Sequence, residues 1–234
     1  VWYKPHRRPL GLGLYSSFFF CRRNMISHHK LIRRLRADLQ KTCQTFLYRI
    51  PAWRRHFWNQ MALNVHENYG RLDHDYDVIG GLIDTYQPAS LLDYGCGSGR
   101  LIPLYLKKKL QNIYCYDASE ISLKLAQSQF PDAAIHFTTS LKEILRRSDQ
   151  FDLIVCSRVL QHIPADSIGG VVEKICAMGG RVFVNESRNR SDKYFMFLHD
   201  YQLIFQQNDF VQTSAGVMQD AHGNLQEWSL FAHG

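Results

Sequence analysis

LLDYGCGSGRLIPLYL, residues 91–106, places a short apolar run directly before three alternating glycines and a second apolar run directly after them. The first run is typical of a buried β-strand and the second of a helix. Glycine has no side chain between its amide and a ligand, so Gly95, Gly97 and Gly99 allow a sharp turn and a close approach. A helix that begins there presents unpaired N–H groups to an anion. The stretch therefore predicts a strand, turn and helix that cradle a ligand with backbone.

The chain around this stretch alternates between two kinds of pattern. Short apolar runs typical of strands occupy 91–94, 112–117, 134–139, 151–160 and 180–187, and helices are expected from about residues 99 and 120 and over 141–147 and 166–178. This repetition of strand and helix predicts a parallel sheet with right-handed crossovers. A helix over 192–207 and two strand-like runs around a turn at 222–224 follow, which predicts an antiparallel hairpin at the sheet edge.

A carboxylate follows the second predicted strand. Asp117 lies 22 residues after Gly95, where it can accept hydrogen bonds from both hydroxyls of a ribose. Arg100 occupies the position at which the dinucleotide fingerprint has its third glycine, and the chain contains no P-loop motif. These features indicate an adenosine-bearing cofactor that is neither a dinucleotide nor a nucleoside triphosphate.

The net charge of +7 comes entirely from the N-terminal part of the chain. Residues 1–60 contain 13 Lys and Arg and one acid, whereas residues 61–234 contain 15 Lys and Arg and 20 Asp and Glu. The apolar positions of 28–50 recur at helical spacing, and Pro51 is expected to end this helix. The basic helix favours an anionic partner, either nucleic acid, an acidic membrane surface or an acidic protein, although a solvated helix face is an equal alternative.

The length of the apolar runs and the spacing of the cysteines bear on the location of the protein. The longest apolar run, residues 10–20, is shorter than the ~20 residues that a membrane-spanning helix needs, so no transmembrane segment is expected. The six cysteines include no C-x-x-C pair, which argues against a zinc site and a disulfide scaffold and favours a reducing, cytoplasmic location. Residues 1–24 are interpreted as an upstream extension or a targeting segment, because Met25 is an alternative start.

The sequence resembles class I S-adenosylmethionine-dependent methyltransferases, particularly the small-molecule group. DYGCGSGR, the acidic strand end at Asp117, FDLIVCSRVLQHIP and GGRVFVNES resemble motifs I, II and IV and the strand motif that follows. The resemblance covers about residues 65–234. It implies a doubly wound, Rossmann-like α/β fold with seven strands, the last antiparallel, and S-adenosyl-L-methionine as cofactor. We expect residues 61–234 to form this methyltransferase domain and residues 1–60 a basic helical extension or lid.

The resemblance also implies a set of residues that bind the cofactor: Tyr69, Arg71, Asp93, Gly95, Cys96, Gly97, Gly99, Asp117, Ala118, Ser119, Ser140, Leu141, Cys156 and Ser157. In this set Asp93 would anchor the glycine turn, whose residues line the methionine half, and Asp117 would hold the ribose. Ala118 and Ser119 would lie beside the adenine. The other contacts are expected from Ser140 and Leu141 near the adenine amine, from the backbone of Cys156 and Ser157 at the cofactor amino group, and from Tyr69 and Arg71 over the methionine end.

The acceptor is expected to be a small molecule, and methylation of a hydroxyl would need a base. His162, after the fourth strand, is the candidate because the ordinary pKa of histidine suits proton transfer near neutrality; the alternative is that it only shapes the pocket. Glu186 and Arg188 are further candidates for substrate contact, or rim charges. The aromatic residues at 53, 57 and 58 could stack on the acceptor or belong to the core.

Some chemistries are disfavoured and others stay open. The fourth strand ends without a carboxylate cluster, so no metal site is expected. The N/D-P-P-Y/F sequence that serves N-methylation of bases is absent. Two alternatives remain: a nucleic-acid methyltransferase that docks through its basic arm, and a catalytically silent relative that acts as an interaction or assembly factor.

Overall fold

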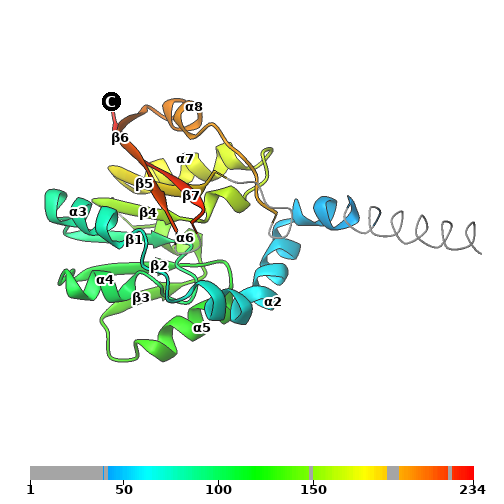
Figure 1. Cartoon of the computed structure of the whole chain (residues 1–234), viewed down its shortest axis with the longest axis horizontal. Helices are drawn as coiled ribbons and strands as arrows, with labels where there is room; N and C mark the ends of the chain where they lie inside the picture. The colour runs from blue at the N-terminus through cyan, green and yellow to red at the C-terminus, as the bar shows by residue number, and fades with distance from the viewer. Residues whose placement is uncertain (1–38, 40–41, 148–149, 189–194, 221–222) are drawn as a thin grey trace, which may run out of the picture. The chain divides into compact units, whose positions relative to one another are not determined.

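A seven-stranded sheet forms the centre of the computed structural model (Figure 1). Its strands along the chain are β1 (Ser90–Tyr94), β2 (Asn112–Tyr116), β3 (Ile135–Thr138), β4 (Leu153–Ser157), β5 (Arg181–Ser187), β6 (Phe210–Gln219) and β7 (Leu225–His233). Their order in the sheet is β3-β2-β1-β4-β5-β7-β6. Strands β1 to β5 pair in parallel, whereas β7 pairs antiparallel with both β5 and β6. The predicted doubly wound α/β fold with a C-terminal antiparallel hairpin is confirmed.

Helices cover both faces of the sheet. They are α2 (Pro51–Tyr69), α3 (Tyr76–Tyr86), α4 (Ile102–Lys107), α5 (Glu120–Gln129), α6 (Leu141–Leu145), the 3-10 turn η1 (Leu160–His162), α7 (Ile168–Met178) and α8 (Tyr201–Gln206). Buried side chains of α3, α4 and α5 share one core with the sheet, and those of α6, α7 and α8 share the other. Strand β1 serves both cores, because Leu91 points to the first and Leu92 to the second.

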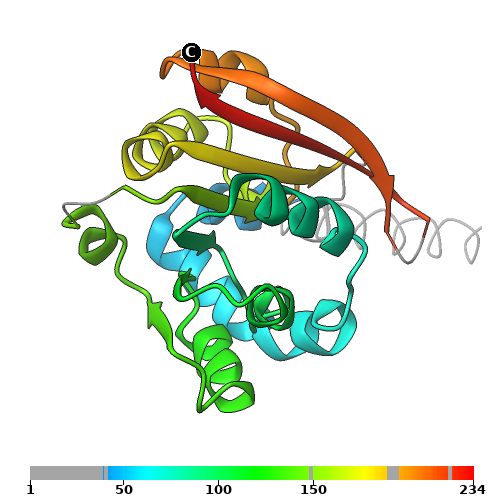
Figure 2. The ribbon, with the colours of Figure 1, turned by 90° about the vertical axis from the view of Figure 1, so that its left-hand side faces the viewer.

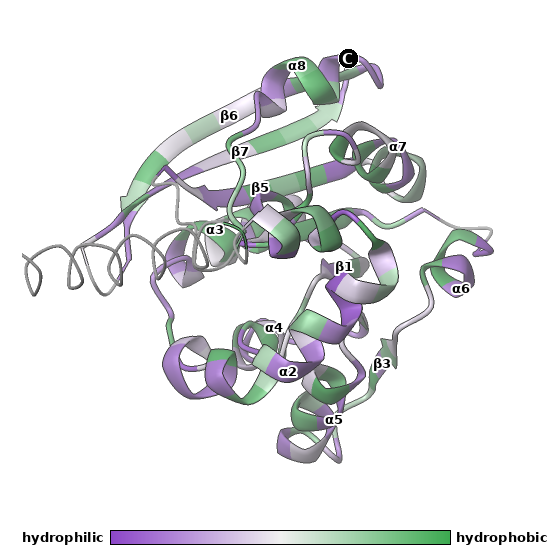
Figure 3. Ribbon diagram, turned by 90° about the vertical axis from the view of Figure 1, so that its right-hand side faces the viewer, coloured by the Kyte–Doolittle hydropathy of each residue, from purple (hydrophilic) through white to green (hydrophobic). Residues whose placement is uncertain are grey.

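Figure 3 colours the ribbon by the hydropathy of each residue. In Figure 3 the helix α7 shows green, apolar stretches, and every strand from β1 to β5 contains buried residues. Strands β1, β4 and β5 are buried along most of their length, and strands buried on both faces must be apolar, which is why the apolar runs of the sequence located these three. Figure 2 shows β6 and β7, in orange and red, as a long ribbon beyond β5.

The structure describes residue 39 and residues 42–147, 150–188, 195–220 and 223–234. The chain divides into two compact units, residues 1–47 and 48–234. Most of the predicted basic helix over 28–50, and all of residues 1–24, lie outside the described residues; within the remainder, residues 42–48 are helical. Pro51 stands in the first turn of α2, after a break at residues 49 and 50, so it starts a new helix. Helix α2 passes through residue 60 without interruption.

The helix predicted over 192–207 is shorter than expected. Residues 195–200 are not helical, and α8 begins only at Tyr201. Asp200 caps this start by accepting a hydrogen bond from the Leu203 amide at 3.0 Å. None of the described helices combines the length and the apolar character that a bilayer crossing requires.

Candidate active site

The glycine turn after β1 adopts backbone conformations that favour glycine. Gly95, Gly97 and Gly99 have φ angles of +80°, +56° and +86°. The amides of Gly95 and Cys96 both donate to the Tyr116 carbonyl, at 2.7 and 3.0 Å, which fixes the turn to the end of β2. A Cβ atom at Gly95 or Gly99 would collide with a neighbouring side chain, but one at Gly97 would meet no atom within 4 Å. Gly97 therefore faces open space.

Asp117 lies directly opposite this open position. Its Oδ2 accepts a hydrogen bond from the Gly97 amide at 2.9 Å, and its Oδ1 accepts one from the Ser119 amide at 2.7 Å. Burial raises the pKa of this carboxyl, although both backbone bonds favour its ionised form. Each carboxylate oxygen has a second lone pair, so Asp117 can still accept from a ligand. The fold thus brings together the two features that sequence analysis linked.

Asp93 does not anchor the turn as expected. It is buried at 2% exposure, its Oδ2 has no hydrogen-bond partner, and the bonds that hold the turn are made by Tyr116 and Asp117. Asp93 lies within β1, before the chain leaves the sheet, so its side chain is buried beneath the turn. Burial raises its pKa to about 7, although the positive charge of Arg100 opposes this shift.

Ser119 and Ser140 use their hydroxyls to cap helices. The Ser119 hydroxyl accepts from the Ser122 amide at the start of α5 and lies 2.8 Å from Oδ1 of Asn59 in α2. Ser140 accepts from the Glu143 amide at the start of α6. A ligand on this side would therefore meet backbone rather than free hydroxyls. Next to these caps, Ala118 is exposed and Leu141 is half-buried.

Cys96 and Cys156 both have buried thiols, and the Cys96 Sγ donates to the Gly97 carbonyl of the turn at 3.6 Å. Cys96 belongs to the core of α3, α4 and α5, and Cys156 to the opposite core. Burial raises the pKa of both thiols, so neither is a reactive thiolate. A contact of either residue with a ligand would have to come from its backbone, and for Cys156 this contact stays a prediction.

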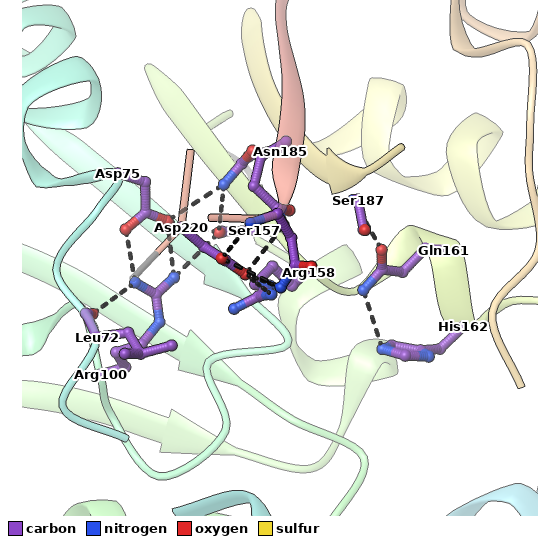
Figure 4. Close-up of polar contacts among 12 residues, drawn as sticks. Leu72, Asp75, Arg100, Ser157, Arg158, Gln161, His162, Asn185, Ser187 and Asp220 are labelled. Carbon is purple, nitrogen blue, oxygen red and sulfur yellow. Dashed lines mark hydrogen bonds and ion pairs between the residues drawn. The ribbon is translucent and has the colours of Figure 1, made fainter. Parts of the chain in front are cut away.

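Arg100 forms a buried ion pair that sequence analysis did not predict (Figure 4). Its Nη1 and Nη2 contact the two oxygens of Asp75 at 2.5 and 2.8 Å, and its Nη2 lies 3.0 Å from the Ser157 hydroxyl. Asn185 joins the same group from β5, 3.3 Å from the Ser157 hydroxyl. Burial would raise the pKa of Asp75, but the hydrogen bonds and charge of Arg100 lower it to about 2. The guanidinium thus ties the glycine turn to the end of β4.

His162 lies in η1 after β4, as expected, but one of its ring nitrogens is engaged (Figure 4). Gln161 accepts a hydrogen bond from the Ser187 amide through Oε1 at 2.9 Å, which orients its amide so that Nε2 lies 3.2 Å from Nε2 of His162. An amide nitrogen only donates, so His162 must accept with this nitrogen and is neutral in this arrangement. The Trp58 ring packs edge-on against the imidazole, with centroids 4.7 Å apart.

The other two candidates for substrate contact differ from each other. The interpretation of Glu186 as a rim charge is wrong, because it is buried at 4% exposure and its Oε1 accepts from the amides of Val159 and Leu160, at 3.2 and 2.7 Å. It thereby caps the turn that carries His162. Arg188 is an exposed residue that pairs with Glu227 of β7 at 2.5 Å.

Replacing Glu186 with glutamine should change how stability depends on pH. Burial raises the pKa of Glu186 from 4.5 to about 8, so the folded state holds a proton that the unfolded state releases. The stabilisation that the protonated Glu186 carboxyl contributes is therefore fully present below about pH 4.5 and is lost as the pH rises toward about 8. Glu186→Gln keeps an acceptor for the η1 amides and cannot ionise, so its Tm should fall less between pH 5 and pH 8 than that of the parent.

Thermal unfolding monitored by circular dichroism across this pH range measures the effect. Glu227→Gln is the matched control, because Glu227 is an exposed carboxylate on the neighbouring strand. It should follow the parent profile. A Glu186→Gln profile as steep as that of the parent would show that the buried carboxyl carries no such linkage.

The aromatic residues before the sheet contact one another. Tyr48, which is fully buried, stacks on Phe195 at 4.2 Å and meets Trp53 and Phe57 edge-on. The residues at 53 and 57 therefore pack in an aromatic cluster with Tyr48 and Phe195, and both are half-buried. Trp58 differs from them because it also contacts His162.

Helix α2 and the loop after it bring together residues that sequence analysis missed. Asn59 contacts Ser119, and Nδ1 of His66 lies 2.9 Å from the hydroxyl of Ser98 in the glycine turn. Tyr69 places its ring 5.5 Å from the Arg158 guanidinium, whereas Arg71 is exposed. The polar stretch RLDHDYD between α2 and α3 was the available signal for Asp75, but no pattern identifies its partner. Within the described ranges, no three His, Cys, Asp or Glu residues converge as a metal site.

The strand order, the glycine turn after β1 and the carboxylate after β2 define the class I fold of S-adenosylmethionine-dependent methyltransferases. Comparison with known families agrees. The chain belongs to the methyltransferase-domain family, whose model matches residues 58–228.

Individual relatives are distant. The ubiquinone biosynthesis O-methyltransferase of Aeromonas salmonicida (strain A449) is 24% identical over 133 residues, which cover 55% of this chain and 54% of that protein. The chain thus matches about half the length of this curated relative.

Solved structures share the fold. Magnesium protoporphyrin IX methyltransferase from Synechocystis PCC 6803, with bound S-adenosylmethionine, has a TM-score of 0.63 at 18% identity and covers 79% of this chain and 97% of its own. The N-methyltransferase NodS from Bradyrhizobium japonicum WM9, in complex with S-adenosyl-L-homocysteine, has a TM-score of 0.55 at 14% identity, with coverages of 67% and 84%. S-adenosylmethionine is the cofactor of this family.

Proposed function

We propose that this chain transfers the methyl group of S-adenosylmethionine to a small-molecule acceptor. The observation that carries the proposal is the pairing of Gly97 with Asp117. A left-handed glycine with open space beside it is hydrogen-bonded to the half-buried carboxylate of Asp117. Such an arrangement suits a nucleoside, whose ribose hydroxyls need an acceptor and whose bulk needs backbone without side chains.

The residues at the strand ends fit this cofactor. Asp117 would accept from the ribose hydroxyls, the backbone at Ala118 and Ser119 would lie beside the adenine, and Gly97 would face the methionine half. The end of β4, at Cys156 and Ser157, would approach the amino group through backbone. The bound cofactor supplies an electrophilic sulfonium methyl group. The chain contributes position and exclusion of water, which can provide most of the rate of such a transfer.

A hydroxyl is the acceptor group that we favour. The related ubiquinone biosynthesis enzyme is named as an O-methyltransferase. His162, in η1 after β4, would be the proton acceptor for such a group. We further propose a cytoplasmic location, since the five described cysteines are free thiols. The basic extension over residues 1–60 would act as a lid or would dock an anionic membrane surface or nucleic acid.

Gly97→Ala should abolish measurable binding of S-adenosylhomocysteine, because the new methyl group would occupy the space that the cofactor needs. Gly223→Ala is a closely matched control. Gly223 also has a positive φ, +78°, and a Cβ there would also meet nothing within 4 Å. Both substitutions impose a similar backbone strain, of order 1 kcal/mol, so stability should fall comparably in the two variants.

Isothermal titration calorimetry with S-adenosylhomocysteine, with NAD as the comparison ligand, measures the outcome. We expect the parent and Gly223→Ala to bind the homocysteine nucleoside and neither to bind NAD. Equal affinity of Gly97→Ala and the parent would refute this cofactor site. An intact site in a protein that methylates no small molecule, but whose binding to RNA weakens steeply as salt rises, would instead favour the nucleic-acid alternative.

A further inference from the structure

The helix over residues 42–48 has an apolar face that the described part of the chain leaves exposed. Leu39 is also helical, and Cys43, Phe46 and Leu47 follow it by four, seven and eight residues. This spacing is typical of side chains on one face of a helix. Leu39 and Phe46 are 66% and 68% exposed, and Leu47 is 37% exposed. Apolar side chains grouped on a surface indicate a binding partner.

The exposed apolar side chains are concentrated in this part of the chain. Ile50, which precedes α2, is 45% exposed. Of the large apolar side chains that the described ranges leave exposed, four lie between residues 39 and 50, whereas the other ten are spread over residues 63–225. Single exposed apolar residues are normal on a protein surface, but a group within so short a segment is not. The segment before α2 is therefore the part of the described surface that is most suited to contact an apolar phase.

The same part of the chain is basic. Residues 39–66 contain four Lys and Arg and no Asp or Glu. Arg49 and Arg55 are exposed, and the only ion pair of Arg49 in the described structure joins it to the exposed Asp166 at 3.5 Å, which contributes little. Residues 61–234, with 15 Lys and Arg and 20 Asp and Glu, carry a net charge of −5. The positive charge before α2 therefore attracts an anionic partner and repels a second copy of itself.

The apolar side chains decide which anionic partner fits. Nucleic acids bind through phosphates and through bases that stack on aromatic rings, and the aliphatic Leu47 and Ile50 cannot stack. An anionic lipid surface offers negative head groups beside an apolar interior, which matches arginines that alternate with exposed apolar side chains. Charge and apolar exposure together therefore favour a lipid surface.

We propose that the docking segment, residues 42–55, binds an anionic lipid surface. The inference rests on the docking role proposed above for the basic extension and commits that role to lipid. The side chains of Phe46, Leu47 and Ile50 would enter the boundary between the head groups and the acyl chains. Arg49 and Arg55 would contact the head groups.

Docking would bring the candidate active site to the membrane. The docking segment continues into α2, whose Trp58 ring packs against His162. Ile50 and Trp58 are eight residues apart, which corresponds to about 12 Å of helix. The proposed proton acceptor would therefore lie close to the lipid surface.

The experiment measures how the full chain cosediments with vesicles of phosphatidylcholine alone and of phosphatidylcholine mixed with phosphatidylglycerol. One variant combines Phe46→Ser with Leu47→Ser, and a second combines Arg49→Gln with Arg55→Gln. The matched controls are Leu203→Ser on α8, where the leucine is 52% exposed, and Lys174→Gln at an exposed position of α7. Calorimetry with S-adenosylhomocysteine tests the cofactor site of each protein separately.

We expect the parent to bind the mixed vesicles, to bind phosphatidylcholine alone much more weakly, and to lose affinity as salt rises. The Phe46 and Leu47 variant should bind the mixed vesicles at least about 10-fold more weakly, because two apolar side chains no longer enter the bilayer. Each arginine removed should lower the affinity about 5-fold at low salt. Both controls should bind like the parent, and all five proteins should bind S-adenosylhomocysteine alike.

Equal binding of the parent to both kinds of vesicle would overturn the proposal, as would parent-like binding of the Phe46 and Leu47 variant. A parent that binds a single-stranded RNA but no vesicle would also overturn it and would assign the basic segment to nucleic acid. The calorimetry separates this inference from the methyl-transfer function. A parent that binds vesicles but not S-adenosylhomocysteine would refute that function alone, and the opposite result would refute lipid docking alone.

Discussion

Asp117→Ala is expected to lower the affinity for S-adenosylhomocysteine by at least about 100-fold, because each charged hydrogen bond to a ribose hydroxyl contributes about 1.5–3 kcal/mol. The same carboxylate also holds the Gly97 and Ser119 amides, so alanine should destabilise the protein as well. Asp117→Asn separates the two effects. Its side-chain oxygen can still accept one amide bond, but it lacks the charge and the second acceptor that the ribose needs.

Calorimetry and thermal shift measure this result together. A ligand at about 100 times its dissociation constant should stabilise the parent by about 2.7 kcal/mol, and this stabilisation should be absent from both variants. Asp132→Asn, an exposed carboxylate in the loop before β3, is the control and should bind like the parent. Parent-like affinity in a folded Asp117→Asn protein would remove Asp117 from the cofactor site.

Arg100→Met should destabilise the folded protein by about 3–5 kcal/mol, because it leaves the fully buried Asp75 carboxylate without its cationic partner. Burial would then raise the pKa of Asp75, so the deficit should shrink as the pH falls and the carboxyl becomes protonated. Asp75→Asn combined with Arg100→Met removes the buried charge altogether. The double variant should therefore recover much of the lost stability.

Urea unfolding at pH 7 and pH 5 measures the free energy of unfolding of the parent, the two single variants and the double variant, which together form a double-mutant cycle. Lys124→Met is the control, since it breaks the exposed Lys124–Glu120 pair on α5 and should change stability little. Additive effects of Arg100→Met and Asp75→Asn would mean that the two side chains do not stabilise each other.

The sequence was sufficient for the sheet and for the centre of the site because both depend on local patterns. Apolar runs between turn residues located β1 to β5, and the glycines with Asp117 located the cofactor turn. The antiparallel hairpin of β6 and β7 followed from its two runs and turn. In each case the feature depends on patterns that can be recognised within a single strand and the loop that follows it, or in two such units that are neighbours along the chain.

Features that depend on residues far apart were not predictable in this way. Arg100 was interpreted only as a departure from the dinucleotide fingerprint, because nothing near it in the sequence shows that it pairs with Asp75, which lies in a loop 25 residues earlier. Glu186 was interpreted as a possible rim charge because nothing in the sequence of β5 shows that the amides at the start of η1 bind the end of this strand.

The order of the last two strands has a consequence for how the chain folds during synthesis. β6 is made before β7 but reaches the rest of the sheet only through it, since β7 lies between β5 and β6. Until the ribosome has released Leu225–His233, the outer edge of β5 stays unpaired and β6 has no strand to bind. A nascent chain that stops short of this point exposes the open edge of β5, with which strands of other proteins can pair.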